Sequence, residues 1–221
     1  MKINDDKTQL LCISDCNFSN INSFIYTDIE SKVVSEDTMK ILGFVFNRKP
    51  NASAHICHII QKFNRAVWSL THLRKAGIEN AVLLKVFSVM LRPIIEFCSP
   101  IYHTLITQEQ SAQIERLQRM ALQIIYGFGK GYGEILSISG LKTLEERRVE
   151  AFRNFTLNVV KNERYNSWFP KTQESSVNLR DRKKYVEKFA RTERLYSSPL
   201  FQMRRLLNEE NRDTNKNEKS N

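Results

Sequence analysis

The helix that the sequence predicts from about residue 51 to residue 76 carries the side chains best suited to contact a ligand. Its apolar residues recur on one face, and the opposite face combines cations, amides and an aromatic ring without any acid. Cations neutralise phosphates and aromatic rings stack on bases, so this face suits a phosphate backbone or groove. The predicted contacts are His58, Gln61, Lys62, Arg65, Trp68 and His72. The alternative is a solvated helix surface on which Trp68 packs under a neighbouring element.

Cysteine and histidine residues lie close together at two places in the sequence. Cys12 and Cys16 are separated by three residues, and His55, Cys57 and His58 lie close together. Thiolate and imidazole are ligands that zinc prefers, but these spacings fit no standard ligand pattern, and the second group falls inside the predicted helix. We therefore predict no metal site.

Two further motifs point toward phosphate or metal chemistry but are incomplete. The glycine-rich run 127–133 resembles a phosphate-binding loop, but Lys130 is followed by glycine and the run comes after a helix, so we interpret it as a connector. Asp5 and Asp6 form an adjacent acidic pair of the kind that holds Mg²⁺ in polymerases. That chemistry needs a third carboxylate and a hairpin, so a solvated turn is the better interpretation. No catalytic triad can be proposed.

The elements that must position these residues change in type at Pro50. Before it, short apolar runs predict a small antiparallel β segment, whose strongest strand covers residues 39–46. After it, the apolar period is helical, and capping boxes begin at Thr107 and Thr143. The predicted fold class is mainly α. The expected parts are a β-rich segment 1–50, a helical domain 51–170, a basic helical extension 171–207 and a disordered tail 208–221.

Three features are expected within the helical part. Pro93 should kink or restart a helix that begins near residue 79. A helix that follows Thr107 should end at Gly127. Its expected core residues are Ile114, Leu117, Ala121, Ile124 and Ile125.

The composition favours an intracellular protein with an anionic partner. The chain has 221 residues, with 34 Lys and Arg against 24 Asp and Glu, which gives a net charge of +10. Such a field attracts polyanions, although a basic surface without a partner is equally compatible. The sequence has no apolar run long enough for a membrane span, no secretory signal and no disulfide framework. We expect a nuclear or cytoplasmic location and no membrane partner.

Six segments match motifs of one known family in the same order. They read MKINDDKTQLLCIS, MKILGFVFN, HICHIIQKFNRAVWSLTHLRKAGI, LRPIIEFCSPIYHTLIT, SAQIERLQRMALQIIYG and LKTLEERRVEAF. Together with YNSWFP and MRRLLN, they resemble the C-terminal part of non-LTR retrotransposon reverse transcriptases of the jockey and CR1 type. The resemblance covers about residues 1–208, and Phe44 and Asn47 depart from the commonest residues of the second motif.

This resemblance implies the last palm strands in 1–50, a thumb in 51–170 and a C-terminal extension beyond. The family's fingers, and the aspartates that bind its Mg²⁺, lie before the matched part. The resemblance thus implies a fragment of an RNA-directed DNA polymerase that binds RNA or an RNA–DNA duplex but is inactive by itself, with no cofactor of its own. The missing palm and fingers are a further implied partner. Of the family's functional residues only Lys7 is matched, in a motif that helps position the incoming nucleotide.

The resemblance also implies that the strands lack their usual cover. Without palm strands, apolar residues such as Ile41 and Phe44 would be exposed, and residues 1–50 would be sensitive to proteases. Two other functions remain open. One is a co-opted helical module that binds nucleic acid or protein. The other is a domain similar to the segment labelled as an AlkB-homologue N-terminal domain, although the chain lacks the His-x-Asp pair of an Fe(II) oxygenase.

Overall fold

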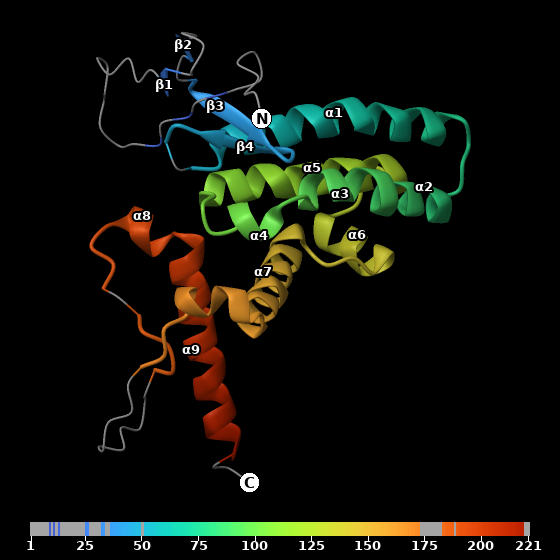
Figure 1. Ribbon diagram of the computed structural model, residues 1–221. Coiled ribbons are helices and arrows are strands. Elements are labelled where there is room, and N and C mark those ends of the chain that lie inside the picture. Colours follow the sequence, from blue (N-terminus) through green and yellow to red (C-terminus); the bar gives the residue numbers. More distant parts are fainter. Residues whose placement is uncertain are drawn as a thin grey trace. The chain divides into compact units, whose positions relative to one another are not determined.

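The computed structural model consists of short strands followed by helices. It describes residues 9, 11, 13, 25–26, 32–33, 36–49, 51–172, 183–187 and 189–218. Among these residues it has nine α-helices and two antiparallel strand pairs (Figure 1). The first pair is β1 (Ile25–Tyr26) with β2 (Lys32–Val33), and the second is β3 (Thr38–Ile41) with β4 (Phe44–Asn47). The predicted mainly α fold with a small N-terminal antiparallel β segment is confirmed.

The chain divides into two compact units. The first comprises residues 1–98 and 106–144, and the second comprises residues 99–105 and 145–221. The division at residue 144 falls inside the segment 51–170 that the sequence suggests as one helical domain. No helix within the described residues is long and apolar enough to cross a membrane.

The second strand pair is a hairpin, so the prediction of a single strand over residues 39–46 is wrong. The chain reverses at Leu42 and Gly43, whose φ angles are 49° and 89°. Tight hairpin turns of type I′ need positive φ at both central residues, and Asn or Asp usually takes the first position. Here Leu42 occupies the first position. The turn therefore lies within a continuous apolar run, and the sequence pattern does not indicate it. Gly43 is also needed for space, because a Cβ there would lie 3.0 Å from the ring of Phe97.

The hairpin packs on helix α1 (Ser53–Lys75), which covers part of its apolar surface. Phe44 is only 5% exposed, and its ring centroid lies 4.2 Å from that of His55 on α1. Ile41 remains 47% exposed. The expectation that these strands lack cover is therefore wrong for Phe44, because the first helix supplies the cover from within the chain.

We expect limited proteolysis to leave this hairpin attached to the helices. Burial of a Phe side chain contributes about 2 kcal/mol, and the backbone N–H of Val45 donates to Nδ1 of His55 at 3.4 Å. Mass spectrometry should place the start of the most resistant fragment before Thr38. A most resistant fragment that begins after Pro50 would contradict the docking.

Helix α1 begins and ends close to the predicted positions. The backbone N–H of Ser53 donates to the Asn51 side chain at 3.2 Å, and Gly77, with φ of 81°, follows the last turn. The helix is buried along one face, as its apolar period predicts. The buried residues are His55, Ile56, Ile59, Phe63 and Leu70.

The next helical segment is interrupted before Pro93. Helix α2 (Asn80–Val86) continues into a π-helix, η2 (Phe87–Leu91), and then into α3 (Arg92–Glu96). The N–H of Arg92 bonds to the carbonyl of Phe87, five residues back. Pro93 has no N–H to donate to the preceding turn, so the local widening occurs where the sequence predicts a kink.

Helix α5 (Gln108–Tyr126) begins with the predicted capping box. The Gln110 N–H donates to the Thr107 hydroxyl at 3.2 Å, and the Thr107 N–H donates to the Gln110 side chain at 3.0 Å. The predicted core residues are buried except Ile124, which is half-buried. Helix α6 (Tyr132–Ser139), which the sequence pattern did not predict, begins inside the glycine-rich run at its cap, Gly131.

The second unit has its own core around helix α7 (Leu144–Lys161), whose first residue belongs to the first unit, and helix α9 (Pro199–Glu218). It also contains the short helix α4 (Ser99–Tyr102), the 3₁₀ helix η3 (Glu163–Trp168) and α8 (Glu193–Tyr196). Its buried cluster comprises Phe152, Phe169, Tyr185, Met203 and Leu207.

Helix α9 corrects the prediction of a disordered tail from residue 208. Asn208 is only 4% exposed, and its side chain makes two hydrogen bonds with the backbone of Tyr185, at 2.9 and 3.1 Å. The polar segment that follows has no Gly or Pro, so the helix continues to Glu218. Composition alone favoured disorder, but the helix is already nucleated by its apolar first half.

Candidate nucleic-acid interface

Helix α1 presents the six predicted contact residues along its unburied side. Its 23 residues contain no Asp or Glu. Gln61, Lys62, Arg65, Trp68 and His72 are exposed, and His58 is half-buried. Residues seven apart on a helix are about 10 Å apart along its axis, so His58, Arg65 and His72 form an axial row. The structure therefore brings the predicted residues onto one helix face.

The cations on this face have no acidic partner among the residues that the structure describes. Within the part of the chain that the structure describes, neither Lys62 nor Arg65 forms an ion pair. The pKa of His58 is lowered from its ordinary value by burial first, and then by the positive charges of Lys40, Lys62 and Arg65. Lys40, Lys62 and Arg65 thus lie close enough to His58 to make its surroundings positive.

Trp68 is exposed and braced by its own helix. Its side chain is 63% exposed, which contradicts the alternative that it packs under a neighbouring element. The ring of His72 lies 3.7 Å from the Trp68 ring, measured between centroids, and the His72 Nδ1 donates to the Trp68 carbonyl at 3.0 Å. An aromatic ring held in place from one side offers its remaining surface for stacking at a low entropic cost.

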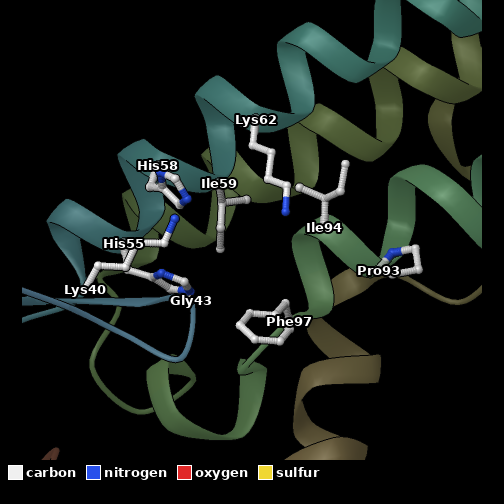
Figure 2. Close-up of a pocket in the computed structure, with 9 residues that line it drawn as sticks. All are labelled: Lys40, Gly43, His55, His58, Ile59, Lys62, Pro93, Ile94 and Phe97. Atoms are coloured by element: carbon white, nitrogen blue, oxygen red, sulfur yellow. The ribbon is translucent and has the colours of Figure 1, made fainter.

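A pocket of about 330 Å³ opens beside the first half of α1 (Figure 2). Strand β3 contributes Lys40, the turn contributes Gly43, and α3 with its following residue contributes the opposite wall. No Asp or Glu is among the described residues that line it. The lining residues are Lys40, Gly43, His55, His58, Ile59, Lys62, Pro93, Ile94 and Phe97. Sequence reasoning missed this pocket because its walls come from three separate segments.

His55 is the buried residue of the pocket lining, and it contacts the hairpin from α1. It is 1% exposed and accepts the hydrogen bond from Val45, and the backbone of Phe97 is close enough to influence its pKa. The pKa of His55 is lowered to about 4, mainly by burial; the backbone of Phe97 opposes this shift, and the charge of His58 adds to it. His55 is therefore neutral at physiological pH and connects α1 to the hairpin and to the end of α3.

Three polar residues of the segment SAQIERLQRMALQIIYG, namely Glu115, Gln118 and Arg119, make structural contacts. Gln118 is fully buried on α5, and its amide donates to the Tyr132 hydroxyl and to the Lys142 carbonyl, both at 3.0 Å. The Tyr132 hydroxyl donates to Glu115, and the guanidinium of Arg119 lies over the Tyr132 ring. Burial and then the bond to Glu115 raise the pKa of Tyr132, so this tyrosine stays neutral.

Glu115 also fixes the start of the next long helix. Its carboxylate accepts the backbone N–H of Leu144, at distances of 3.1 and 3.2 Å to its two oxygens. An anion at the first N–H groups of a helix is favourable. Two side chains of α5, Glu115 and Gln118, thus hold α6 and the first residue of α7.

We expect Gln118→Leu to lower the free energy of unfolding by about 2–4 kcal/mol. The substitution removes two partly buried hydrogen bonds and leaves the Lys142 carbonyl without this donor. Chemical denaturation measures the change. The matched control is Gln113→Leu, a half-buried glutamine on the same helix, which should change stability by less than about 1 kcal/mol. Equal losses in the two variants would contradict the structural role of Gln118.

The other sequence candidates are not assembled into a site. Cys57 is exposed while His55 is buried, and the described residues contain no group of three side chains placed to hold a metal ion. Lys130 is exposed in the connector between α5 and α6. Lys7, Asp5, Asp6, Cys12 and Cys16 lie outside the described residues.

The chain was compared with protein-family models, curated proteins and solved structures, and no match was found in any of the three.

Proposed function

We propose that this chain binds nucleic acid along α1, with RNA or an RNA–DNA duplex as its preferred partner and little sequence preference. It would act as a thumb does in the non-LTR retrotransposon reverse transcriptases that the sequence resembles. The observation that carries this proposal is the exposed, acid-free face of α1, where Lys62 and Arg65, which form no ion pair among the described residues, lie beside the Trp68 ring.

The spacing on this face fits contact with a strand. Lys62, Arg65 and Trp68 follow one another at three-residue intervals, about 4.5 Å apart along the helix axis. Lys62 and Arg65 would neutralise phosphates, which gives affinity without sequence information. Trp68 would stack on an unpaired base or the end of a duplex, because every base offers a π-face.

Charge reversal at Arg65 tests the proposal. We expect Arg65→Glu to weaken binding of a fluorescent 20-nucleotide RNA, and of the same RNA paired with DNA, by about tenfold in anisotropy titrations, since a phosphate contact becomes a repulsion. The matched control is Lys85→Glu, an exposed cation on α2. It changes the net charge by the same amount at a position outside the proposed face.

The salt dependence of RNA affinity shows whether the loss of affinity comes from a lost phosphate contact. Each phosphate contact contributes about −0.7 to −0.9 to the slope of log affinity against log salt concentration. Arg65→Gln should therefore reduce the magnitude of the slope by about one contact, whereas Lys85→Gln should leave it unchanged. Equal effects at Arg65 and Lys85 would place the binding surface elsewhere on the chain.

A further inference from the structure

One side of the pocket beside α1 carries cations from two elements. Lys40 extends from β3, and His58 and Lys62 descend from α1, so that both lysine side chains reach toward the same space (Figure 2). The lysines have no ion pair within the described residues. Three nitrogen-bearing side chains around one opening suit a group with several anionic oxygens, such as a phosphate.

The other side of the pocket is apolar and includes an aromatic ring. Pro93 and Ile94 form this wall together with Phe97, which is 48% exposed, whereas Ile59 lies on α1 between His58 and Lys62 (Figure 2). The hairpin turn passes close to the Phe97 ring, because a Cβ added at Gly43 would lie 3.0 Å from it. A flat, partly apolar group would be accommodated here by contact with Phe97 and Ile94.

The nearby carboxylate does not neutralise the pocket. Glu96 precedes Phe97 on α3, but it is not among the lining residues, and it pairs with Arg92 at 3.8 Å. The lowered pKa of His58, caused by burial and by the positive charges of Lys40, Lys62 and Arg65, agrees with an excess of positive charge at the opening. The volume of about 330 Å³ is at the lower end of the range for small-molecule sites.

We propose that this pocket binds one nucleoside phosphate, with its phosphate at Lys40, His58 and Lys62 and its base against Phe97 and Ile94. The ligand would be either a free nucleotide or the phosphorylated end of a bound strand. In the second case the inference rests on the proposed function of α1, because the strand would run from the pocket onto the face that carries Arg65.

The first experiment separates the parts of the ligand. Calorimetric titration of the full chain should detect binding of AMP, while adenosine and inorganic phosphate each bind at least tenfold more weakly. The two halves of the pocket each supply part of the contact, so neither part of AMP alone reaches its affinity. Binding of phosphate as tightly as AMP would reduce the site to an anion site and overturn the proposal, as would no detectable AMP binding.

Variants assign the binding to this pocket. Lys40→Gln should weaken AMP binding about tenfold through loss of one charge-assisted contact, and Lys85→Gln is the matched control. Phe97→Ala should weaken AMP binding and leave phosphate binding unchanged. If Lys40→Gln and Lys85→Gln bind AMP equally, the ligand lies elsewhere. Circular dichroism spectra and thermal unfolding of both variants show whether a loss is local.

The nuclear magnetic resonance signal of His58 gives an independent readout. An anion beside an imidazole favours its protonated form, so saturating AMP should raise the pKa of His58, whereas adenosine should not. The matched reference is His72, which lies outside the pocket on the same helix. An unchanged His58 pKa at saturating AMP would overturn the placement of the phosphate.

One comparison of RNA ligands identifies the source of the nucleotide. One comparison of variants shows whether AMP binding depends on the α1 face. A 5′-phosphorylated RNA that binds more tightly than its hydroxyl form, with the difference abolished by Lys40→Gln, supports the strand end. Equal binding of the two RNAs together with AMP binding supports the free nucleotide. Arg65→Glu should weaken RNA binding and reduce AMP binding less than Lys40→Gln does. These experiments can therefore reject the AMP site while supporting RNA binding on α1. They can also reject RNA binding on α1 while supporting the AMP site.

Discussion

Acid should destabilise the first unit through His55, and His55→Asn should remove most of that sensitivity. His55 is buried and neutral, with a pKa lowered to about 4, while an unfolded chain protonates it near 6.5. Between these values the unfolded state binds more protons, so stability falls as pH falls through this window. From pH 7.5 to pH 4.5 the loss from this residue is about 2.5 kcal/mol.

Urea denaturation at the two pH values measures this effect as a difference within each protein. The wild-type chain and His55→Asn contain the same carboxylates. The contribution of these carboxylates to the pH dependence of stability therefore cancels when the two proteins are compared. Because Asn does not titrate, the variant should lose about 2.5 kcal/mol less than the wild type over this range. The matched control is His72→Asn, which makes the same substitution at an exposed position of the same helix. A His55→Asn variant with wild-type acid sensitivity would contradict the burial of a neutral His55.

Loss of the indole ring in Trp68→Ala should have the largest effect on binding. Base stacking on an aromatic side chain contributes about 1–3 kcal/mol, so affinity for single-stranded RNA should fall by about 5- to 150-fold. Trp68→Phe, which keeps an aromatic surface, should recover part of the affinity. Anisotropy titrations with an unstructured RNA measure both effects.

Trp168→Ala is the matched control for Trp68→Ala. Trp168 is 47% exposed and belongs to the second unit, where its ring packs beside that of Tyr165. Its backbone carbonyl, which accepts from Arg204, is retained in the variant. If both substitutions weaken RNA binding to the same degree, the effect does not depend on the position of the tryptophan. That result would contradict RNA binding along α1.

The sequence predicts well where periodicity and capping decide the structure. Helix α1 has one apolar stripe and one acid-free face, and both lie where the helical period puts them. The capping box at Thr107 is local chemistry between residues three apart, so it is readable without tertiary information. The six candidate contacts share a helix face for the same reason.

The prediction fails where distant residues decide the outcome. Gln118 interrupts an apolar face, yet it is buried because Tyr132 and the Lys142 carbonyl are brought to it. The turn at Leu42 is concealed by its apolar side chain and is stabilised by the packing of the hairpin on α1. The pocket brings Lys40 and Phe97 together from two distant segments. No pattern within either segment predicts that the other lies beside it.

Crosslinking tests the central claim, that nucleic acid lies along the exposed face of α1, most directly. The full chain would be irradiated with RNA containing 4-thiouridine, and the crosslinked peptides would be identified by mass spectrometry. We predict crosslinks on the α1 peptide that contains Trp68, and their loss in Trp68→Ala combined with Arg65→Glu. Crosslinks confined to the basic segment 171–207, with none on α1, would contradict the account.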